Sequence, residues 1–240
     1  MKKNIQSLLK RDLELFPLIA YFVFYFLYLF FDKILEQKDY AILVKPIIIP
    51  IIVFLYLTNK KSKRTIVNLF LLMLIFISDN STLLEIRSFH IYATIIYIIV
   101  LFILLNYALL DMKYVAVIQN NKNKLSSILC SVFIITFFYS VFNLNPNSKT
   151  AEKFIVFEHI IVCLLLFKVS FINYLKLKSN KTKYLFLSIL CLLLSEFCFS
   201  MQRYYNAHIV FKYIFCIVEI PVYYFLLKYL LLKDKESIEQ

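Results

Sequence analysis

The sequence predicts an all-α fold, a polytopic transmembrane helical bundle of eight spans that forms a single integral membrane domain over residues 1–240. Three observations lead to this fold class. Hydrophobic residues make up 62% of the chain, whereas ordinary soluble domains contain roughly 45–50%. Long apolar runs recur along the whole sequence, and basic residues gather in every second connection between these runs.

The apolar runs are long enough to cross a bilayer, since a spanning helix needs roughly 20 apolar residues. Lipid offers no hydrogen-bond partners, so a spanning segment must be a helix or part of a closed barrel. The runs lack the apolar/polar alternation of barrel strands, which leaves helices. The predicted spans are residues 15–31, 41–58, 65–86, 89–110, 125–144, 154–175, 184–202 and 207–232.

The basic residues predict the orientation of these spans. Cytoplasmic loops of membrane proteins carry an excess of Lys and Arg, so the alternation fits an even number of spans with both termini in the cytoplasm. We expect a bacterial cytoplasmic membrane, because residues with AT-rich codons are abundant. The basic clusters are Lys2, Lys3, Lys10 and Arg11; Lys60, Lys61, Lys63 and Arg64; Lys113, Lys122 and Lys124; Lys176, Lys178, Lys181 and Lys183; and Lys233 and Lys235.

The composition excludes several classes of function. The chain contains no glycine, so it cannot form the glycine-rich loops that cradle nucleotide phosphates. The net charge of +12 lies in connections between apolar runs and not along one polar face, which argues for topology signals and against a nucleic-acid partner. The five cysteines lie in apolar runs without CxxC spacing, so we expect no metal and no cofactor.

The chain resembles itself at a shift of about 117 residues. Residues 61–65 align with 178–182, and the same shift aligns Asp79 with Glu196, each preceded by a serine. If the match is not a coincidence among apolar residues, residues 1–115 and 116–240 form two parallel four-helix halves. Repeat folds of this kind place their binding site at the interface of the halves.

Ionisable residues inside the predicted spans are candidates for a functional site, because a charge in lipid costs a few kcal/mol. Asp79 and Glu196 are the strongest, since each follows a serine deep in an apolar run. Five further residues have structural alternatives, such as an interfacial position or a lysine that reaches the membrane surface. They are Lys45, Glu158, His159, Glu219 and Lys212.

Three short motifs resemble the YhhN, or lysoplasmalogenase, family of eight-span membrane proteins. They are Lys45-Pro46, Ser78-Asp79, and Ser195-Glu196 followed by Arg203-Tyr204. The chain departs from that pattern where Glu196 replaces an aspartate and Gln202 an asparagine, and where Glu219 stands in place of a glutamine. The resemblance implies hydrolysis of the vinyl-ether bond of a membrane lysolipid, which yields a fatty aldehyde and a glycerophospho head group.

Under this resemblance the two deep carboxyls are the catalytic pair. Vinyl-ether hydrolysis needs a proton delivered to carbon, stabilisation of an oxocarbenium-like cation and an activated water. A protonated carboxyl suits the first task and an ionised one the others, so we assign them to Asp79 and Glu196 without deciding which is the acid. Lys45 and Arg203 are expected to bind the lipid phosphate, and Glu158, His159 and Glu219 complete the predicted substrate-binding set.

Two other functions fit the same residues. In a small-solute or proton-coupled transporter, the carboxyls relay protons or bind a cation between the two halves. A non-catalytic family member would tolerate the loss of both acids.

Overall fold

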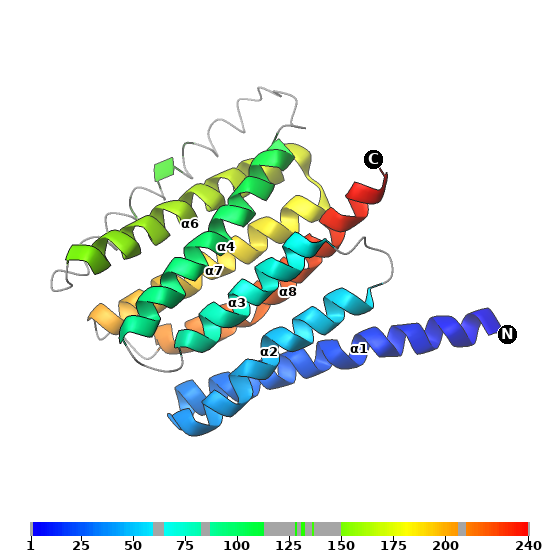
Figure 1. Ribbon diagram of the computed structural model, residues 1–240, viewed down its shortest axis with the longest axis horizontal. Helices are drawn as coiled ribbons and strands as arrows, with labels where there is room; N and C mark the ends of the chain where they lie inside the picture. Colours follow the sequence, from blue (N-terminus) through cyan, green and yellow to red (C-terminus); the bar gives the residue numbers. More distant parts are fainter. Residues whose placement is uncertain are drawn as a thin grey trace. The chain divides into compact units, whose positions relative to one another are not determined.

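The computed structural model describes residues 2–59, 65–82, 87–112, 150–205 and 210–239, together with residues 128, 131, 132 and 136. Within these residues the chain is all-α, without strands (Figure 1). This confirms the all-α part of the prediction. The helices are α1 (Lys2–Leu29), α2 (Lys38–Thr58), α3 (Ile66–Ser81), α4 (Arg87–Met112), α6 (Thr150–Leu177), α7 (Asn180–Tyr205) and α8 (Val210–Glu239), with a π-helical segment, η1 (Phe30–Ile34), after α1.

These helices cover seven of the eight predicted spans, and the predicted span at residues 125–144 falls almost wholly outside the described residues. In the described part of the chain, five helices have apolar stretches long enough to cross a membrane: α1, α2, α4, α6 and α8. These stretches run from 18 to 26 residues, and α3 is a shorter apolar helix. These five helices therefore have the length and apolar character of membrane-spanning helices.

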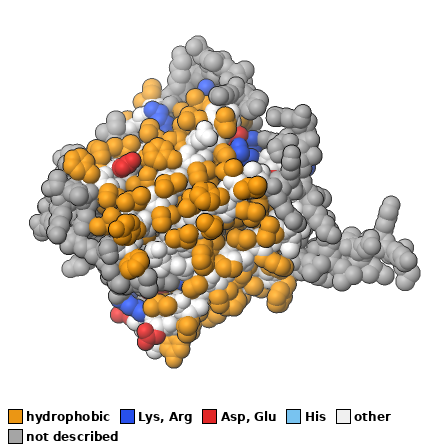
Figure 2. Space-filling view, viewed as in Figure 1, with side chains coloured by type: hydrophobic (Ala, Val, Ile, Leu, Met, Phe, Trp, Pro, Cys, Tyr) orange, Lys and Arg blue, Asp and Glu red, His pale blue; other side chains and the backbone are white. Residues whose placement is uncertain are grey.

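Hydrophobic side chains cover much of the described helices on the face that Figure 2 shows. Large side chains such as Phe16, Leu43, Ile66 and Ile217 are each at least 70% exposed. Exposed apolar area costs roughly 25 cal/mol per Å² in water, and soluble monomers rarely display contiguous patches of this extent. Contact with lipid chains removes that cost.

The described chain divides into two compact units. The first contains residues 1–76 and 230–240, and the second contains residues 77–229. In the first unit α1 packs against α2, and the inner side of α1 is lined by Tyr21, Tyr25 and Tyr28, which are at most 5% exposed. Their rings meet edge to face at 5.6 and 6.1 Å, a geometry that aromatic quadrupoles favour.

In the second unit α6 packs against both α4 and α7. The turn from α6 to α7 has only two residues, and Lys178 adopts a left-handed conformation with φ of 47°. Glycine normally takes this position because a β carbon is disfavoured there, but this chain has none. Ser179 is the N-cap of α7, because its Oγ accepts a hydrogen bond from the Thr182 amide at 3.2 Å.

Short polar side chains tie helices of the second unit together through backbone carbonyls. The Ser78 hydroxyl of α3 donates to the Ala93 carbonyl of α4 at 2.9 Å. The Asn173 amide of α6 reaches the Ala108 carbonyl of α4 at 2.7 Å. The Ser188 hydroxyl of α7 donates to the Val222 carbonyl of α8 at 2.9 Å. Such bonds are common between membrane helices, where no water competes for the groups.

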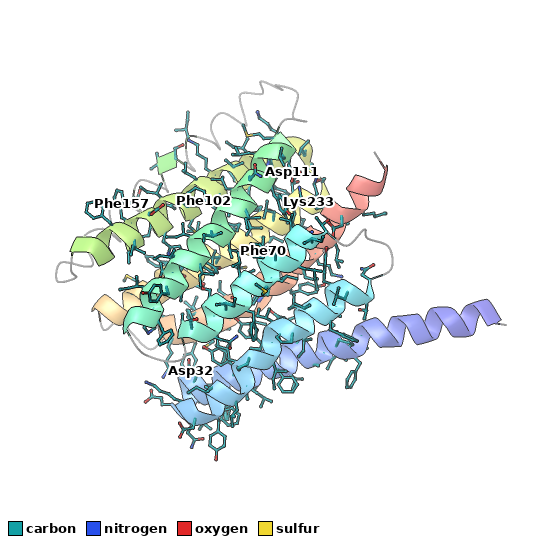
Figure 3. The ribbon with its side chains drawn as sticks, in the orientation of Figure 1. Asp32, Phe70, Phe102, Asp111, Phe157 and Lys233 are labelled. Atoms are coloured by element: carbon teal, nitrogen blue, oxygen red, sulfur yellow. The ribbon has the colours of Figure 1, made fainter. Side chains whose placement is uncertain are left out.

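A buried ion pair joins three helices of the second unit. Asp111, labelled near the end of α4 in Figure 3, lies 3.0 Å from the Lys181 ammonium of α7. The Tyr229 hydroxyl of α8 donates to its other carboxylate oxygen at 3.2 Å. Asp111 is 4% exposed and Lys181 is 9% exposed. The ion pair therefore replaces the hydration that both charges have lost.

A second buried acid organises the first unit. Asp234 near the end of α8 is 2% exposed and accepts hydrogen bonds from the Thr65 hydroxyl at 2.7 Å and the Asn68 amide at 2.9 Å. The Tyr56 hydroxyl of α2 also donates to it. Because Thr65 directly precedes α3, this single carboxylate ties the start of α3 to α2 and α8.

Lys181→Met should lower the free energy of unfolding by about 3–5 kcal/mol, because it leaves the Asp111 charge buried without its cation. Adding Asp111→Asn should recover most of that loss, since an amide carries no charge and its oxygen still accepts the Tyr229 hydrogen bond. Thermal unfolding of the purified chain in detergent measures both effects. Equal losses in the single and double variants would show that the charge is not buried as described.

Candidate functional site

The candidate site lies in the second unit and includes a carboxylate that is hydrogen-bonded to a phenol. Asp79 occupies the last turn of α3, and its carboxylate oxygen accepts a hydrogen bond from the Tyr223 hydroxyl of α8 at 2.5 Å. Tyr223 is 8% exposed. A hydrogen bond from a buried phenol to an ionised carboxyl is a charge-assisted contact.

Tyr97 of α4 lies within electrostatic range of three acids of the second unit. Its phenol interacts electrostatically with the carboxyls of Asp79, Glu196 and Glu219, which come from α3, α7 and α8. Tyr223 also interacts with Tyr97 and Glu219. The two carboxyls predicted as a pair, Asp79 and Glu196, thus both lie within electrostatic range of the same side chain.

The serines that precede these acids are packed into the interior. Ser78 is 4% exposed and Ser195 5%. Ser78 bonds to α4 as described above, whereas the Ser195 hydroxyl bonds within α7 to the Leu192 carbonyl at 2.8 Å. Successive helical residues point in directions about 100° apart. Because each serine packs into the interior, the carboxyl that follows it lies at the edge of the packed face. Both acids are half-buried there.

Helix α6 contributes a histidine and a cysteine to the cluster. The His159 ring meets Tyr97 edge to face at 5.7 Å. Its Nε2 atom is buried without a hydrogen-bond partner among the described residues. Cys163 lies one helical turn further along, within electrostatic reach of Glu196. Glu158 is exposed, so the structure separates it from its neighbour His159.

Helix α8 supplies Glu219 and Tyr223 on one face, because residues four apart are neighbours on a helix. Pro221 lies between them and lacks the amide hydrogen that would bond to the preceding turn. The Val222 carbonyl beside it accepts the hydrogen bond of Ser188. This contact anchors α8 against α7 at the level where the two site residues project.

Two predicted phosphate-binding residues are not placed in this cluster. Lys45 of α2 belongs to the first unit, where its ammonium lies 5.1 Å from the centre of the Tyr28 ring, a cation–π contact. The side chain of Arg203 falls outside the described residues. Their role in phosphate binding stays a prediction.

Sequence patterns did not identify Tyr97 and Tyr223 as site residues, although a buried tyrosine hydroxyl usually needs a hydrogen-bond partner. The spacing of Glu219 and Tyr223, four residues apart in an apolar helix, was the available signal. Asp111 and Asp234 were also overlooked, because they lie at helix ends where charges usually face water.

Chemically, the cluster offers carboxyls and phenols in apolar surroundings. Within the described helices, His, Cys, Asp and Glu side chains do not gather in the groups of three that could hold a metal ion. What these residues can do is donate and accept protons and stabilise a positive charge.

Asp79→Asn should fold with a stability close to that of the unchanged chain, because the amide oxygen can still accept the Tyr223 hydrogen bond. Asp79→Ala should cost about 1–3 kcal/mol more, since it leaves that buried hydroxyl without its acceptor. Thermal unfolding in detergent compares the two. A chain that tolerates alanine as well as asparagine would contradict the Asp79–Tyr223 contact.

A scan against protein-family models finds no match, and searches of the curated proteins and of the solved structures find no similar chain. The geometry of this cluster therefore has to support any functional proposal by itself.

Proposed function

We propose that the chain is an eight-span membrane hydrolase that cleaves the vinyl-ether bond of lysolipids. In this proposal both termini lie in the cytoplasm of a bacterial cell, and two four-helix halves enclose the site. The observation that carries the proposal is that Asp79 and Glu196, inside one unit of apolar helices, both lie within electrostatic range of Tyr97. Paired carboxyls in such surroundings are the groups that this acid-catalysed reaction needs.

The chemistry requires one carboxyl in each protonation state. The acid protonates the vinyl carbon, and the resulting oxocarbenium ion is stabilised by the nearby carboxylate. That carboxylate then takes a proton from the attacking water. The hemiacetal so formed breaks its bond to the glycerol oxygen, which leaves with a proton, and an aldehyde is released. Such acid–base steps contribute typically 10²–10⁴-fold to a rate.

Reciprocal contacts support the doubled architecture. At the start of α3, Thr65 bonds to Asp234 of α8, and at the start of α7, Lys181 pairs with Asp111 of α4. Residues 61–65 and 178–182 are the segments that align in the repeat. The third helix of each half is thus tied to the last helix of the other half, as expected for two copies of one plan.

A lipid substrate also fits the surface of the helices. They expose many large apolar side chains, so a lysolipid chain can approach the site through the bilayer. We retain Lys45 and Arg203 as phosphate ligands, and Glu158, His159 and Glu219 as further substrate contacts. Of these, His159 already touches the cluster through Tyr97.

The three acids around Tyr97 favour one alternative, a transporter that relays protons or binds a cation. Acidic residues inside membrane helices often serve that purpose. Flux of a solute into liposomes, without any lipid turnover, would support this alternative and contradict the hydrolase.

The purified chain should release fatty aldehyde from vinyl-ether lysolipids but not from ester or alkyl-ether lysolipids, as measured by mass spectrometry. Asp79→Asn and Glu196→Gln should each lower the rate by at least roughly a hundredfold, because each removes a proton-transfer group. Asp39→Asn is the matched control, since it makes the same change at an exposed carboxyl of α2, and it should keep full activity.

Inertness of the folded chain toward all three lipid classes would overturn the proposed function. Equal turnover of all three would also overturn it, because ester and alkyl-ether bonds cannot form the oxocarbenium ion by protonation at carbon.

A further inference from the structure

Four acids within the helices differ in one respect. Asp79, Asp111 and Asp234 each accept a hydrogen bond from a tyrosine hydroxyl, of Tyr223, Tyr229 and Tyr56 in that order. Glu196 differs from these three aspartates. Among the described residues no hydrogen bond reaches its carboxyl, although it lies deep in α7 between the buried residues Ser195 and Cys198.

This difference favours different protonation states for the two carboxyls of the proposed catalytic pair. A carboxyl that accepts a hydrogen bond from a phenol is favoured as the ion, because the donor replaces part of its lost hydration. A carboxyl in apolar surroundings without such a donor is favoured as the neutral acid. Pairs of acids whose surroundings differ in this way divide the acid and base roles between them.

We infer that Tyr223 is a positioning residue that holds Asp79 as the carboxylate, which leaves Glu196 as the acid that protonates carbon. The assignment rests on the proposed hydrolase function. It deepens that function, because the sequence leaves open which carboxyl is the acid.

The titratable neighbours of both groups are consistent with this division. Tyr97 lies within electrostatic range of both acids, and Cys163 of α6 lies within range of Glu196. Glu219 of α8 interacts with both tyrosines, so three carboxyls share the cluster, and repulsion between like charges disfavours the ionisation of all three. The His159 ring packs on Tyr97 from α6. Repulsion is lower with one carboxyl of the proposed pair neutral than with both ionised.

In the reaction, Glu196 transfers its proton to the vinyl carbon, and the double bond supplies the electron pair. Asp79 stabilises the resulting oxocarbenium ion and takes a proton as water adds to it. When the hemiacetal breaks, the glycerol oxygen leaves with the proton from Asp79. The hemiacetal hydroxyl returns its proton to Glu196, so both carboxyls regain their starting states.

A hydrophobic carbodiimide tests the assignment without any lipid substrate. The reagent adds to a protonated carboxyl and rearranges to a stable N-acylurea, which peptide mass spectrometry locates. With N,N′-dicyclohexylcarbodiimide at neutral pH, the purified full chain in detergent should be modified at Glu196 and not at Asp79. Both carboxyls are half-buried, so each has a surface that the reagent can reach.

Tyr223→Phe should raise the labelling of Asp79 about tenfold or more, the fold-change that corresponds to losing a hydrogen bond to a charged group. Tyr229→Phe is the matched control, because it removes a buried phenol hydroxyl from the same helix but from Asp111 instead. It should leave the labelling of Asp79 unchanged.

Labelling of Asp79 in the unchanged chain, or its absence in Tyr223→Phe, would overturn the inference. Equal labelling of Asp79 in both tyrosine variants would also overturn it, since that result indicates general loosening of the helix. The assay reads protonation and not turnover. The inference can therefore fail while lysolipid hydrolysis stands, and hydrolysis can fail while the protonation states stand.

Discussion

A polar group buried in an apolar membrane bundle must find its partner inside the protein, because lipid provides none. The rest of this structure depends on that constraint. Three aspartates, the buried Asp111 and Asp234 and the half-buried Asp79, each accept a hydrogen bond from a tyrosine hydroxyl of another helix. These contacts tie α3 to α8, α4 to α8 and α2 to α8. Charge burial thus dictates which helices pair, while apolar packing alone would allow many arrangements.

The positions of the helices could be predicted from the sequence because hydropathy over roughly 20 residues is a strong local signal. Spans at 41–58 and 89–110 became α2 (Lys38–Thr58) and α4 (Arg87–Met112). The side-chain contacts between helices could not be predicted in the same way. Lys181 was interpreted as a topology signal, yet it is buried against Asp111, because the contact joins residues far apart in sequence and no local pattern reports it.

The candidate site was partly predictable. Asp79 and Glu196 stood out because a carboxyl deep in an apolar run needs a reason to be there, and both lie around Tyr97. Tyr97 and Tyr223 did not stand out, since tyrosine is common in this chain and most copies serve packing. Whether a phenol meets a carboxylate depends on helix rotation, which composition does not reveal.

The central claim is that Asp79 and Glu196 share one site within the bundle. Cysteines placed at both positions, in a chain whose native cysteines are replaced, should be joined by a short bifunctional thiol reagent in lipid vesicles. A cysteine pair at Asp79 and Tyr223, whose side chains are in contact, shows that the reagent reaches this level of the membrane. Cross-linking of both pairs is the predicted result, and cross-linking of the second pair alone would contradict the account.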